Sequence, residues 1–342
     1  MRDFCCDRVD NKQRFWRTAL LALAAVTAAF AGNVAADNDE HPGLYPVEVG
    51  GQWGFIDVTG ELRIEPRFDE AAPFSEGLAR VELGGETVFI DPQGDVELSL
   101  DFADVGDFHE GLATAQVEEG GGYGYIDRNG EFVIEPRFRQ AYRFSEGLAA
   151  VDVEAPSAAS GEFAYIDHSG EIVIPGPFDG ARHFSEGLAP VLSGGFVFGE
   201  WGYIDQDGNY VIEPAYDDAL SFSEGLAAVK TDDLWIFIDE GGEPVADAGW
   251  ESARHFDGGI AAVERDAFGA GDLWTYIDEG GEEVFNRRFD YAEPFDGELA
   301  RVYLSATGQS YSHTGGEPSW SARGDVWGYI DRNGRVVWTT DD

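Results

Sequence analysis

The chain has 342 residues, of which 43% are hydrophobic and 13% aromatic. This composition can bury a core, so it excludes a wholly disordered protein. There are 66 Asp and Glu residues against 22 Lys and Arg residues, which gives a formal net charge of −44. A field of that sign repels nucleic acid phosphates and anionic membranes, so neither is expected as a partner.

Residues 1–36 resemble a secretory signal peptide. Arg14 and Arg17 precede an apolar stretch over residues 18–31, which is shorter than the roughly 20 apolar residues of a membrane span. Small residues precede Asp37 and fit cleavage after Ala36. A short membrane anchor is the alternative interpretation.

The predicted signal peptide determines the expected location and domain organisation. Cys5 and Cys6 both lie inside it, so the remainder of the chain has no disulfide or thiol chemistry. We expect a periplasmic or secreted protein with no membrane insertion after cleavage. A short disordered N-terminus is expected over 37–43, followed by one β-repeat domain over 44–342.

The charge pattern resembles that of proteins from saline habitats. The first 36 residues carry a net charge of +2, which leaves −46 on the remainder, and Lys12 and Lys230 are the only lysines. At 1 M salt the Debye length is about 3 Å, so repulsion among the acidic groups is screened. The alternatives are an acidic surface for a cationic partner and weak Ca²⁺ binding.

Two motifs recur along the chain, which indicates internal repetition. An aromatic-Ile-Asp-x-x-Gly hexamer begins at Phe55, Phe89, Tyr125, Tyr165, Tyr203, Phe237, Tyr276 and Tyr329. A second motif, Phe-Ser-Glu-Gly-Leu-Ala or a close variant, begins at Phe74, Phe108, Phe144, Phe184, Phe222, Phe256 and Phe295.

Each unit is predicted to contain about four short antiparallel strands. The first strand ends at Asp57, and the second covers 61–64 and is ended by Pro66. The third and fourth strands cover 68–74 and 78–83. The Asp and Gly of each hexamer fit a type I turn, in which the carboxylate accepts a local N–H and glycine permits positive φ. These structural turn residues are Asp57, Gly60, Asp91, Gly94, Asp127, Gly130, Asp167, Gly170, Asp205, Gly208, Asp239, Gly242, Asp278, Gly281, Asp331 and Gly334.

The ends of the repeat region favour a closed ring. Residues 44–49 match a fourth strand, whereas residues 327–338 supply only a first and a second strand. In a closed propeller, the first and last segments commonly share a blade. We therefore predict an all-β fold, a ring of eight blades resembling a β-propeller, with the last blade composite and one strand short. An open β-solenoid of hairpin repeats is the alternative.

The stretches Trp53-Gly-Phe-Ile-Asp57, Trp201-Gly-Tyr-Ile-Asp205 and Trp327-Gly-Tyr-Ile-Asp331 resemble the WG-repeat family of bacterial proteins. The companion Phe-Ser-Glu-Gly-Leu-Ala motifs support this resemblance, which covers about residues 44–340. Four units depart from the Trp-Gly pair and the unit at Tyr123-Gly124 keeps the glycine only, which argues against a catalytic role for the pair. The resemblance implies a β-repeat module used for binding or as a scaffold, and it supplies no catalytic residues.

No catalytic, cofactor-binding or metal-binding residues emerge from the sequence. Glycines do not surround the serines of the second motif in the manner of a nucleophile elbow. His109, His183 and His255 share a register near the second motif in different units, which indicates variable rim positions rather than a metal site. Residues off the repeated register or in the 305–324 insertion are candidate partner contacts: Trp250, Tyr311, His313, Trp320 and Trp338.

The leading functional prediction is an exported, non-enzymatic binding or scaffold module with a salt-adapted acidic surface. Its expected partner is a protein or a cell-envelope glycan, and no cofactor is expected. The alternative is a glycan-acting hydrolase or lyase. Its carboxylate site would lie in the central channel or in the 305–324 insertion.

Overall fold

A computed structural model describes residues 42–153, 161–195, 197–246, 249–266, 272–305 and 325–340, all within one compact unit, Asp39–Asp342. The predicted signal peptide and most of segment 37–43 lie outside these ranges. Throughout the described ranges the chain forms strands, turns and bends but no helix, and hence none that could cross a membrane.

The described strands form eight antiparallel sheets, numbered here in chain order. Sheet 1 contains β1 (Leu44–Val49), β2 (Gln52–Asp57) and β3 (Leu62–Phe68), and sheet 2 contains β4 (Glu70–Ser75), β5 (Leu78–Leu83), β6 (Glu86–Ile90) and β7 (Val96–Ser99). Sheet 3 contains β8 (Asp104–Val105), β9 (Ala113–Gln116), β10 (Tyr123–Ile126) and β11 (Phe132–Phe138). Sheet 4 contains β12 (Gln140–Ala141), β13 (Ala149–Asp152), β14 (Phe163–Ile166) and β15 (Ile172–Phe178). Sheet 5 contains β16 (Gly180–Ala181), β17 (Leu188–Ser193), β18 (Glu200–Asp205) and β19 (Tyr210–Tyr216). Sheet 6 contains β20 (Asp218–Ala219), β21 (Leu226–Thr231) and β22 (Leu234–Asp239), and sheet 7 contains β23 (Ser252–Asp257), β24 (Ile260–Asp266) and β25 (Asp272–Asp278). Sheet 8 contains β26 (Tyr291–Asp296), β27 (Leu299–Ser305), β28 (Asp325–Asp331) and β29 (Val336–Thr339).

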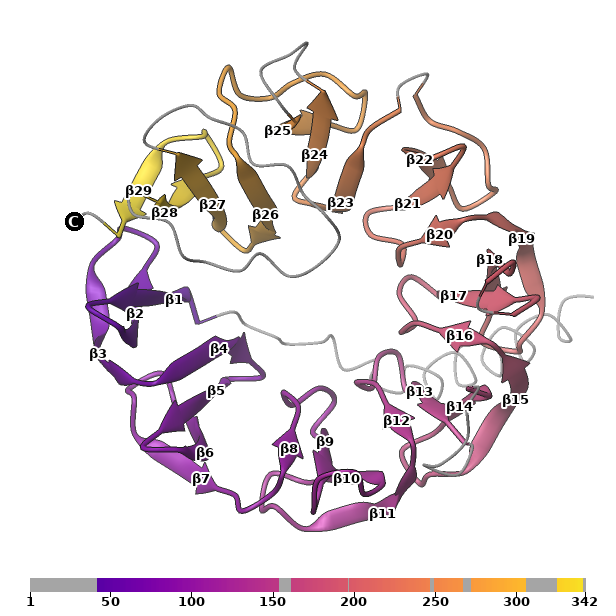
Figure 1. Ribbon diagram of the computed structural model, residues 1–342, viewed down its shortest axis with the longest axis horizontal. Helices are drawn as coiled ribbons and strands as arrows, with labels where there is room; N and C mark the ends of the chain where they lie inside the picture. Colours follow the sequence, from indigo (N-terminus) through magenta and orange to yellow (C-terminus); the bar gives the residue numbers. More distant parts are fainter. Residues whose placement is uncertain are drawn as a thin grey trace, which may run out of the picture. The chain divides into compact units, whose positions relative to one another are not determined.

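The eight sheets follow one another around a ring, with the first strand of each sheet toward the centre (Figure 1). The predicted all-β, eight-bladed propeller is confirmed, and the open solenoid is wrong. In sheets 6 and 7 the fourth strand is replaced by an irregular segment. This segment makes the isolated bridges Trp235–Trp250, Ile238–Pro244, Trp274–Phe289 and Ile277–Glu283.

The expectation that the two ends share a composite last sheet is wrong. β1 pairs with β2 in sheet 1, and sheet 8 has four strands of its own. Each complete sheet begins with the hairpin of the Phe motif and ends with the hairpin of the Asp motif. It is therefore offset by half a repeat from the unit defined in the sequence. Among the described residues, sheet 1 has three strands because it lacks the first strand of the Phe-motif hairpin, whereas sheets 6 and 7 have three because their fourth strand is irregular.

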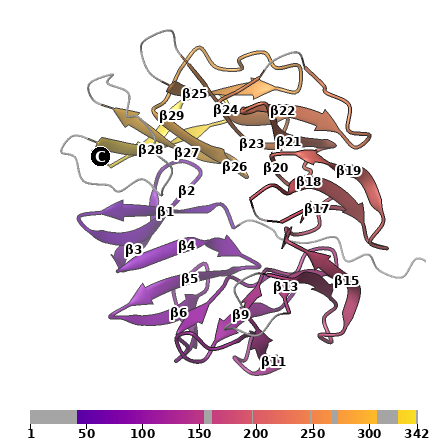
Figure 2. The same ribbon diagram turned by 45° about the vertical axis from the view of Figure 1, so that its right-hand side comes forward.

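Sheet 8 lies beside sheet 1 (Figure 2). Side chains, rather than a shared strand, connect the two sheets. The Tyr329 hydroxyl donates to the Pro46 carbonyl oxygen at 2.9 Å, and the Tyr45 hydroxyl accepts from the Glu298 N–H at 3.1 Å. The Arg301 guanidinium lies 4.1 Å from the ring centre of Trp327 and 5.5 Å from that of Trp53. These contacts close the ring.

The glycine of the Trp-Gly pair provides space for a bulge in the next strand. Pro66 does not end its strand as predicted, because β3 continues to Phe68 through a register shift. A Cβ on Gly54 would lie 2.8 Å from the Pro66 nitrogen, closer than real Cβ contacts allow. In sheet 4, where Ala164 replaces this glycine, Gly176 on the opposite strand provides the same space.

The Asp-x-x-Gly turns connect each sheet to the one before it. In all eight turns the Asp carboxylate accepts the N–H groups two and four residues later, and the glycine has φ between 73° and 84°. Gly94 packs on Ile64 of sheet 1, and Gly60 packs on Val337 of sheet 8. The same packing of a turn glycine on the preceding sheet is therefore also made between sheets 1 and 8, where the ring closes.

In sheets 2 to 6, the second motif connects each sheet to the one after it. The Glu76 carboxylate accepts the Gly111 N–H at 3.0 Å, and the Ser75 hydroxyl donates to the Phe108 carbonyl oxygen at 2.6 Å. Equivalent glutamate contacts are made by Glu110, Glu146, Glu186 and Glu224. All five glutamates have positive φ, a conformation that costs about 1–3 kcal/mol unless the surroundings enforce it.

The closure contact predicts unequal effects for two glycine variants. Gly60 and Gly147 have φ of 83° and 82°, but a Cβ on Gly60 would lie 2.5 Å from the Val337 carbonyl oxygen, whereas a Cβ on Gly147 meets nothing within 4 Å. We expect Gly147→Ala to cost about 1–2 kcal/mol of unfolding free energy. Gly60→Ala should cost roughly 1–3 kcal/mol more because the sheets must separate. Equal unfolding free energies in urea titrations would contradict the closed ring.

Candidate functional site

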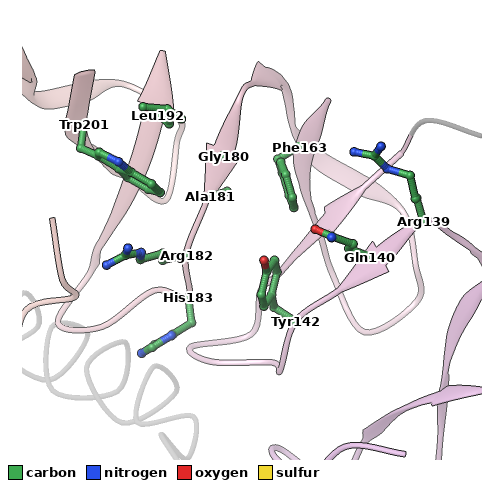
Figure 3. A pocket seen from close by; sticks show the side chains of 10 residues that line it. All are labelled: Arg139, Gln140, Tyr142, Phe163, Gly180, Ala181, Arg182, His183, Leu192 and Trp201. Atoms are coloured by element: carbon green, nitrogen blue, oxygen red, sulfur yellow. The ribbon is translucent and has the colours of Figure 1, made fainter. Parts of the chain in front are cut away.

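A pocket of about 430 Å³ lies between sheets 4 and 5. Figure 3 shows the side chains of sheet 4 on one side of this space and those of sheet 5 on the other. The residues that line the pocket are Arg139, Gln140, Tyr142, Phe163, Gly180, Ala181, Arg182, His183, Leu192 and Trp201.

The pocket exists because a side chain is missing from the innermost strand of sheet 5. Gly180 occupies the register at which the other complete units carry Glu70, Asp104, Gln140, Asp218, Ser252 and Tyr291. A Cβ on Gly180 would lie 3.3 Å from the Leu192 Cβ and 3.3 Å from the Trp201 ring. Any side chain at this position therefore takes up pocket space.

Aromatic side chains line both sides of the pocket. On sheet 4, the rings of Tyr142 and Phe163 lie 6.0 Å apart at 35°, and Tyr142 is 44% exposed. On sheet 5, the Arg182 guanidinium lies 4.7 Å from the ring centre of Trp201. This arrangement offers flat apolar surfaces beside polar groups, which is typical of pockets for small polar ring-shaped ligands.

Ion pairs fix the two arginines of the pocket. The Arg139 guanidinium donates to the buried Asp152 carboxylate at 2.6 Å. The Arg182 guanidinium donates to the Asp218 carboxylate at 2.8 Å and to the Ala219 carbonyl oxygen at 2.6 Å. Asp218 and Ala219 belong to sheet 6, so Arg182 also positions the neighbouring sheet. Such paired guanidiniums hold their orientation before any ligand arrives.

Basic side chains from four sheets converge at the His183 end of the pocket. Arg143 of sheet 4 contacts the His183 Nε2 of sheet 5 at 3.1 Å. His183 also interacts electrostatically with His109 of sheet 3 and His255 of sheet 7. Sheets 3 and 7 are not neighbours of sheet 5 in the ring, so His109 and His255 act on His183 from more distant sheets than Arg143 does.

Burial keeps the imidazole of His183 uncharged at neutral pH. Desolvation, reinforced by the positive charges of Arg143, His109 and His255, lowers the pKa of His183 to about 4. Desolvation also lowers the pKa of His255, although Asp257 opposes that shift and the side chain retains contact with water. At neutral pH, Arg143 therefore supplies the lasting charge beside neutral histidines.

The described residues include no constellation typical of hydrolytic or metal chemistry at this pocket. None of its ten lining residues is a carboxylate, and no group of three or more His, Cys, Asp and Glu in the described ranges could hold a metal ion. Glu293 in sheet 8 has a pKa raised by desolvation, which Arg301 and Arg254 oppose. Glu293 does not line the pocket.

Two of the five candidate partner contacts predicted from the sequence are wrong. Trp250 is 2% exposed and Trp338 is 8% exposed, so both belong to the core. Trp250 forms a β-bridge with Trp235, and in sheet 1 the residue at the same position, Phe68, pairs with Trp53. Trp250 therefore belongs to the repeated register. Trp338 pairs with Tyr329, at the place where sheets 1, 3, 4 and 5 carry an isoleucine and sheet 2 a leucine. The remaining candidates, Tyr311, His313 and Trp320, lie outside the described residues.

The sequence interpretation missed Gly180, Arg143 and the role of His183. The common register of His109, His183 and His255 was the available signal, and it was interpreted as a set of separate rim positions. In the ring, His109 and His255 also act electrostatically on His183. Recognising this required knowing that the hairpin of the second motif lies at the inner edge of sheets 2 to 8 (Figure 1).

The chain belongs to the WG containing repeat family. Seven matches to this family cover most of the ring, at residues 53–86, 89–120, 123–154, 163–195, 201–235, 237–267 and 274–304. This confirms the resemblance inferred from the two motifs. No curated protein matches the chain.

Solved structures resemble the chain only distantly. Hsv2 from Kluyveromyces lactis has 10% identity and a TM-score of 0.43, with 69% of this chain and 92% of that chain covered. An uncharacterised protein from Listeria monocytogenes EGD-e has 11% identity and a TM-score of 0.45, with 72% and 92% covered. Neither similarity identifies a ligand for this chain.

The cluster predicts an unusual titration for His183. We expect an NMR midpoint near pH 4 for its imidazole, against about 6.5 for a histidine in the unfolded chain. Because the unfolded chain then binds a proton that the folded chain does not, stability should fall as pH decreases from about 6.5 toward 4. His183→Gln should weaken this dependence in thermal unfolding. A midpoint near 6.5 in the folded protein would contradict the cluster.

Proposed function

We propose that this chain is an exported, non-enzymatic binding module for a cell-envelope glycan. The observation that carries the proposal is the pocket between sheets 4 and 5 (Figure 3). Tyr142, Phe163 and Trp201 offer ring faces on which a sugar can stack, and Gln140 and Arg182 offer hydrogen-bonding groups at its edges. A glycan has apolar ring faces and polar edges, and the pocket lining combines aromatic and polar side chains in the same way.

Export and salt adaptation belong to the same proposal. The signal-like residues 1–36 support delivery across a membrane. The net charge of −46 on the remainder supports a habitat in which salt screens the acidic surface. A protein in such a place meets the glycans of its own envelope directly.

The two other candidate functions have less support in the described residues. A protein partner would require an exposed rim surface, and the candidate contacts Trp250 and Trp338 are buried. A glycan hydrolase would require a second carboxylate across a binding site from a proton donor. Glu293 is the carboxylic acid whose pKa is raised, and it does not line the pocket.

Filling the pocket tests the proposal directly. The probes are chitotetraose, trigalacturonate and fully methyl-esterified trigalacturonate, each titrated calorimetrically into the full chain. We expect at least one probe to bind and Gly180→Gln to weaken its affinity at least tenfold, about 1.4 kcal/mol. Gln140 stands at the same register of sheet 4, so a strand accommodates glutamine there.

Ser252→Gln is the matched control, because residue 252 has the register of Gly180 but lies in sheet 7. It should leave the affinity unchanged. Failure of all three probes to bind would refute the glycan proposal. An equal loss of affinity in both variants would exclude this pocket as the site.

Salt dependence tests the proposed habitat. The Debye length shortens from about 10 Å at 0.1 M to about 3 Å at 1 M salt, so repulsion among the acidic groups should weaken. We expect the melting temperature to rise as NaCl increases from about 0.1 to 2 M, with the steepest rise at the low end. Sucrose of equal osmolality is the control, because it is uncharged and does not screen the acidic groups. A melting temperature indifferent to NaCl would contradict salt adaptation.

A further inference from the structure

The inner edge of sheet 5 departs from the other sheets at two paired positions. Gly180 of β16 pairs with Leu192 of β17, and Leu192 pairs in turn with Trp201 of β18. In the other sheets that contain the first of these pairs, every side chain in it carries a polar group. Those pairs are Glu70–Glu82, Asp104–Gln116, Gln140–Asp152, Asp218–Lys230, Ser252–Glu264 and Tyr291–Tyr303. Sheet 5 has glycine and leucine instead, so this part of the pocket wall is apolar.

The replacement leaves a small apolar hollow over the Gly180 Cα. A Cβ on Gly180 would lie 3.3 Å from the Leu192 Cβ, 3.6 Å from the Leu192 Cδ2 and 3.3 Å from the Trp201 Cη2. Because Gly180 has no side chain, a small ligand group can lie between these atoms, in the space that side chains occupy in the other sheets. The three neighbours are all carbon atoms, so a hydroxyl placed there would find no hydrogen-bond partner among them. The hollow therefore suits a methyl group.

The basic groups of the pocket lining do not require a charged ligand. Arg139 is paired with Asp152, and Arg182 is paired with Asp218, so carboxylates of the protein already compensate both guanidiniums. His183 is uncharged at neutral pH, because desolvation is the largest of the causes that lower its pKa to about 4. A charged ligand group beside His183 would lose its water of hydration in the same way. The lining therefore favours an uncharged ligand.

Uncharged groups of sheet 4 line the other side of the pocket (Figure 3). The side chain of Gln140 is exposed, and its amide offers both hydrogen-bond donors and an acceptor. The Tyr142 ring is 44% exposed and offers a face on which a sugar ring can stack. Arg143, the charged neighbour of His183, does not line the pocket. The side of the pocket opposite the hollow thus suits a ring with uncharged polar substituents.

We propose that the ligand of this pocket is a glycan of neutral 2-acetamido sugars, whose acetamido methyl group lies over Gly180 against Leu192 and Trp201. This inference rests on the proposed glycan-binding function and specifies its substrate class. An acetamido group joins a methyl group to an uncharged amide, and that amide has the donor and the acceptor that complement Gln140. The sugar ring stacks on Tyr142. A sugar with a hydroxyl at C2 would leave the hollow unfilled.

Two uncharged tetrasaccharides that differ only at C2 test this inference. Chitotetraose carries an acetamido group at C2 of each residue, and cellotetraose carries a hydroxyl there. Both are titrated calorimetrically into the full chain, together with trigalacturonate and its methyl ester. One added carbon in an apolar pocket changes discrimination by about 10–200-fold, so we expect chitotetraose to bind at least tenfold more tightly than cellotetraose. Trigalacturonate should bind no more tightly than its ester.

Variants of the hollow assign the acetamido methyl group to it. Gly180→Ala fills part of the hollow, and it adds no backbone strain because Gly180 is not among the glycines with positive φ. It should remove most of the preference for chitotetraose and leave the affinity for cellotetraose unchanged. Leu192→Gln, which introduces the residue that sheet 3 carries as Gln116, should do the same. Ser252→Ala, at the register of Gly180 in sheet 7, is the control and should change neither affinity. Melting curves of each variant establish that the ring is folded.

The outcomes separate this inference from the proposed function. If cellotetraose or the methyl ester binds as tightly as chitotetraose, the acetamido inference is wrong while the glycan-binding proposal stands. Tighter binding of trigalacturonate than of its ester would overturn the neutral substrate class. If Gly180→Ala weakens both tetrasaccharides equally, or leaves the preference intact, the hollow does not hold the methyl group and the assignment is wrong. If none of the glycans binds, this inference and the proposed function fail together.

Discussion

The hydrogen bond between a glutamate of one sheet and the backbone of the next is the contact that orders sheets 2 to 7 of the ring. Strand pairing among the described strands remains within each sheet, so neighbouring sheets are held together by the connecting chain and by side chains that contact the next sheet. Glu76 and its equivalents adopt positive φ to reach the following turn. A strained backbone that recurs at five places must be enforced by its surroundings. Its recurrence explains why the motif carries glutamate, although glutamate is not a favoured residue for that conformation.

The two motifs make connections in opposite directions, and a ring follows from this. The Phe motif reaches forward to the next sheet, and the Asp-x-x-Gly turn packs backward on the previous one. A chain of such units ends with an unmatched surface at each terminus. In this protein the surfaces match each other, because Gly60 packs on Val337 and Arg301 lies between Trp327 and Trp53. Closure thus needs no shared strand.

The sequence predicted the features that repeat and failed on those that depend on where a repeat begins. The hairpins, the number of units and the ring follow from local turn chemistry and from counting. The division into sheets was offset by half a unit, since a periodic sequence has no marked start. Trp250 and Trp338 were misread because aromatic residues there replace Phe and Ile of other units. Their spacing from the nearest Asp-x-x-Gly turn was the signal that could have corrected this.

The candidate site could not be predicted because it arises from a departure from the repeat combined with adjacency in space. Glycine at position 180 is unremarkable in a sequence with 45 glycines. It acquires meaning only when Leu192 and Trp201 are seen to face it across the gap between two sheets. Likewise, His183 and Arg143 are 40 residues apart and come into contact only when their sheets are neighbours. In a repeat protein, positions shared by all units are already committed to holding the ring. A site for a ligand must therefore be built from residues in which one unit differs from the others.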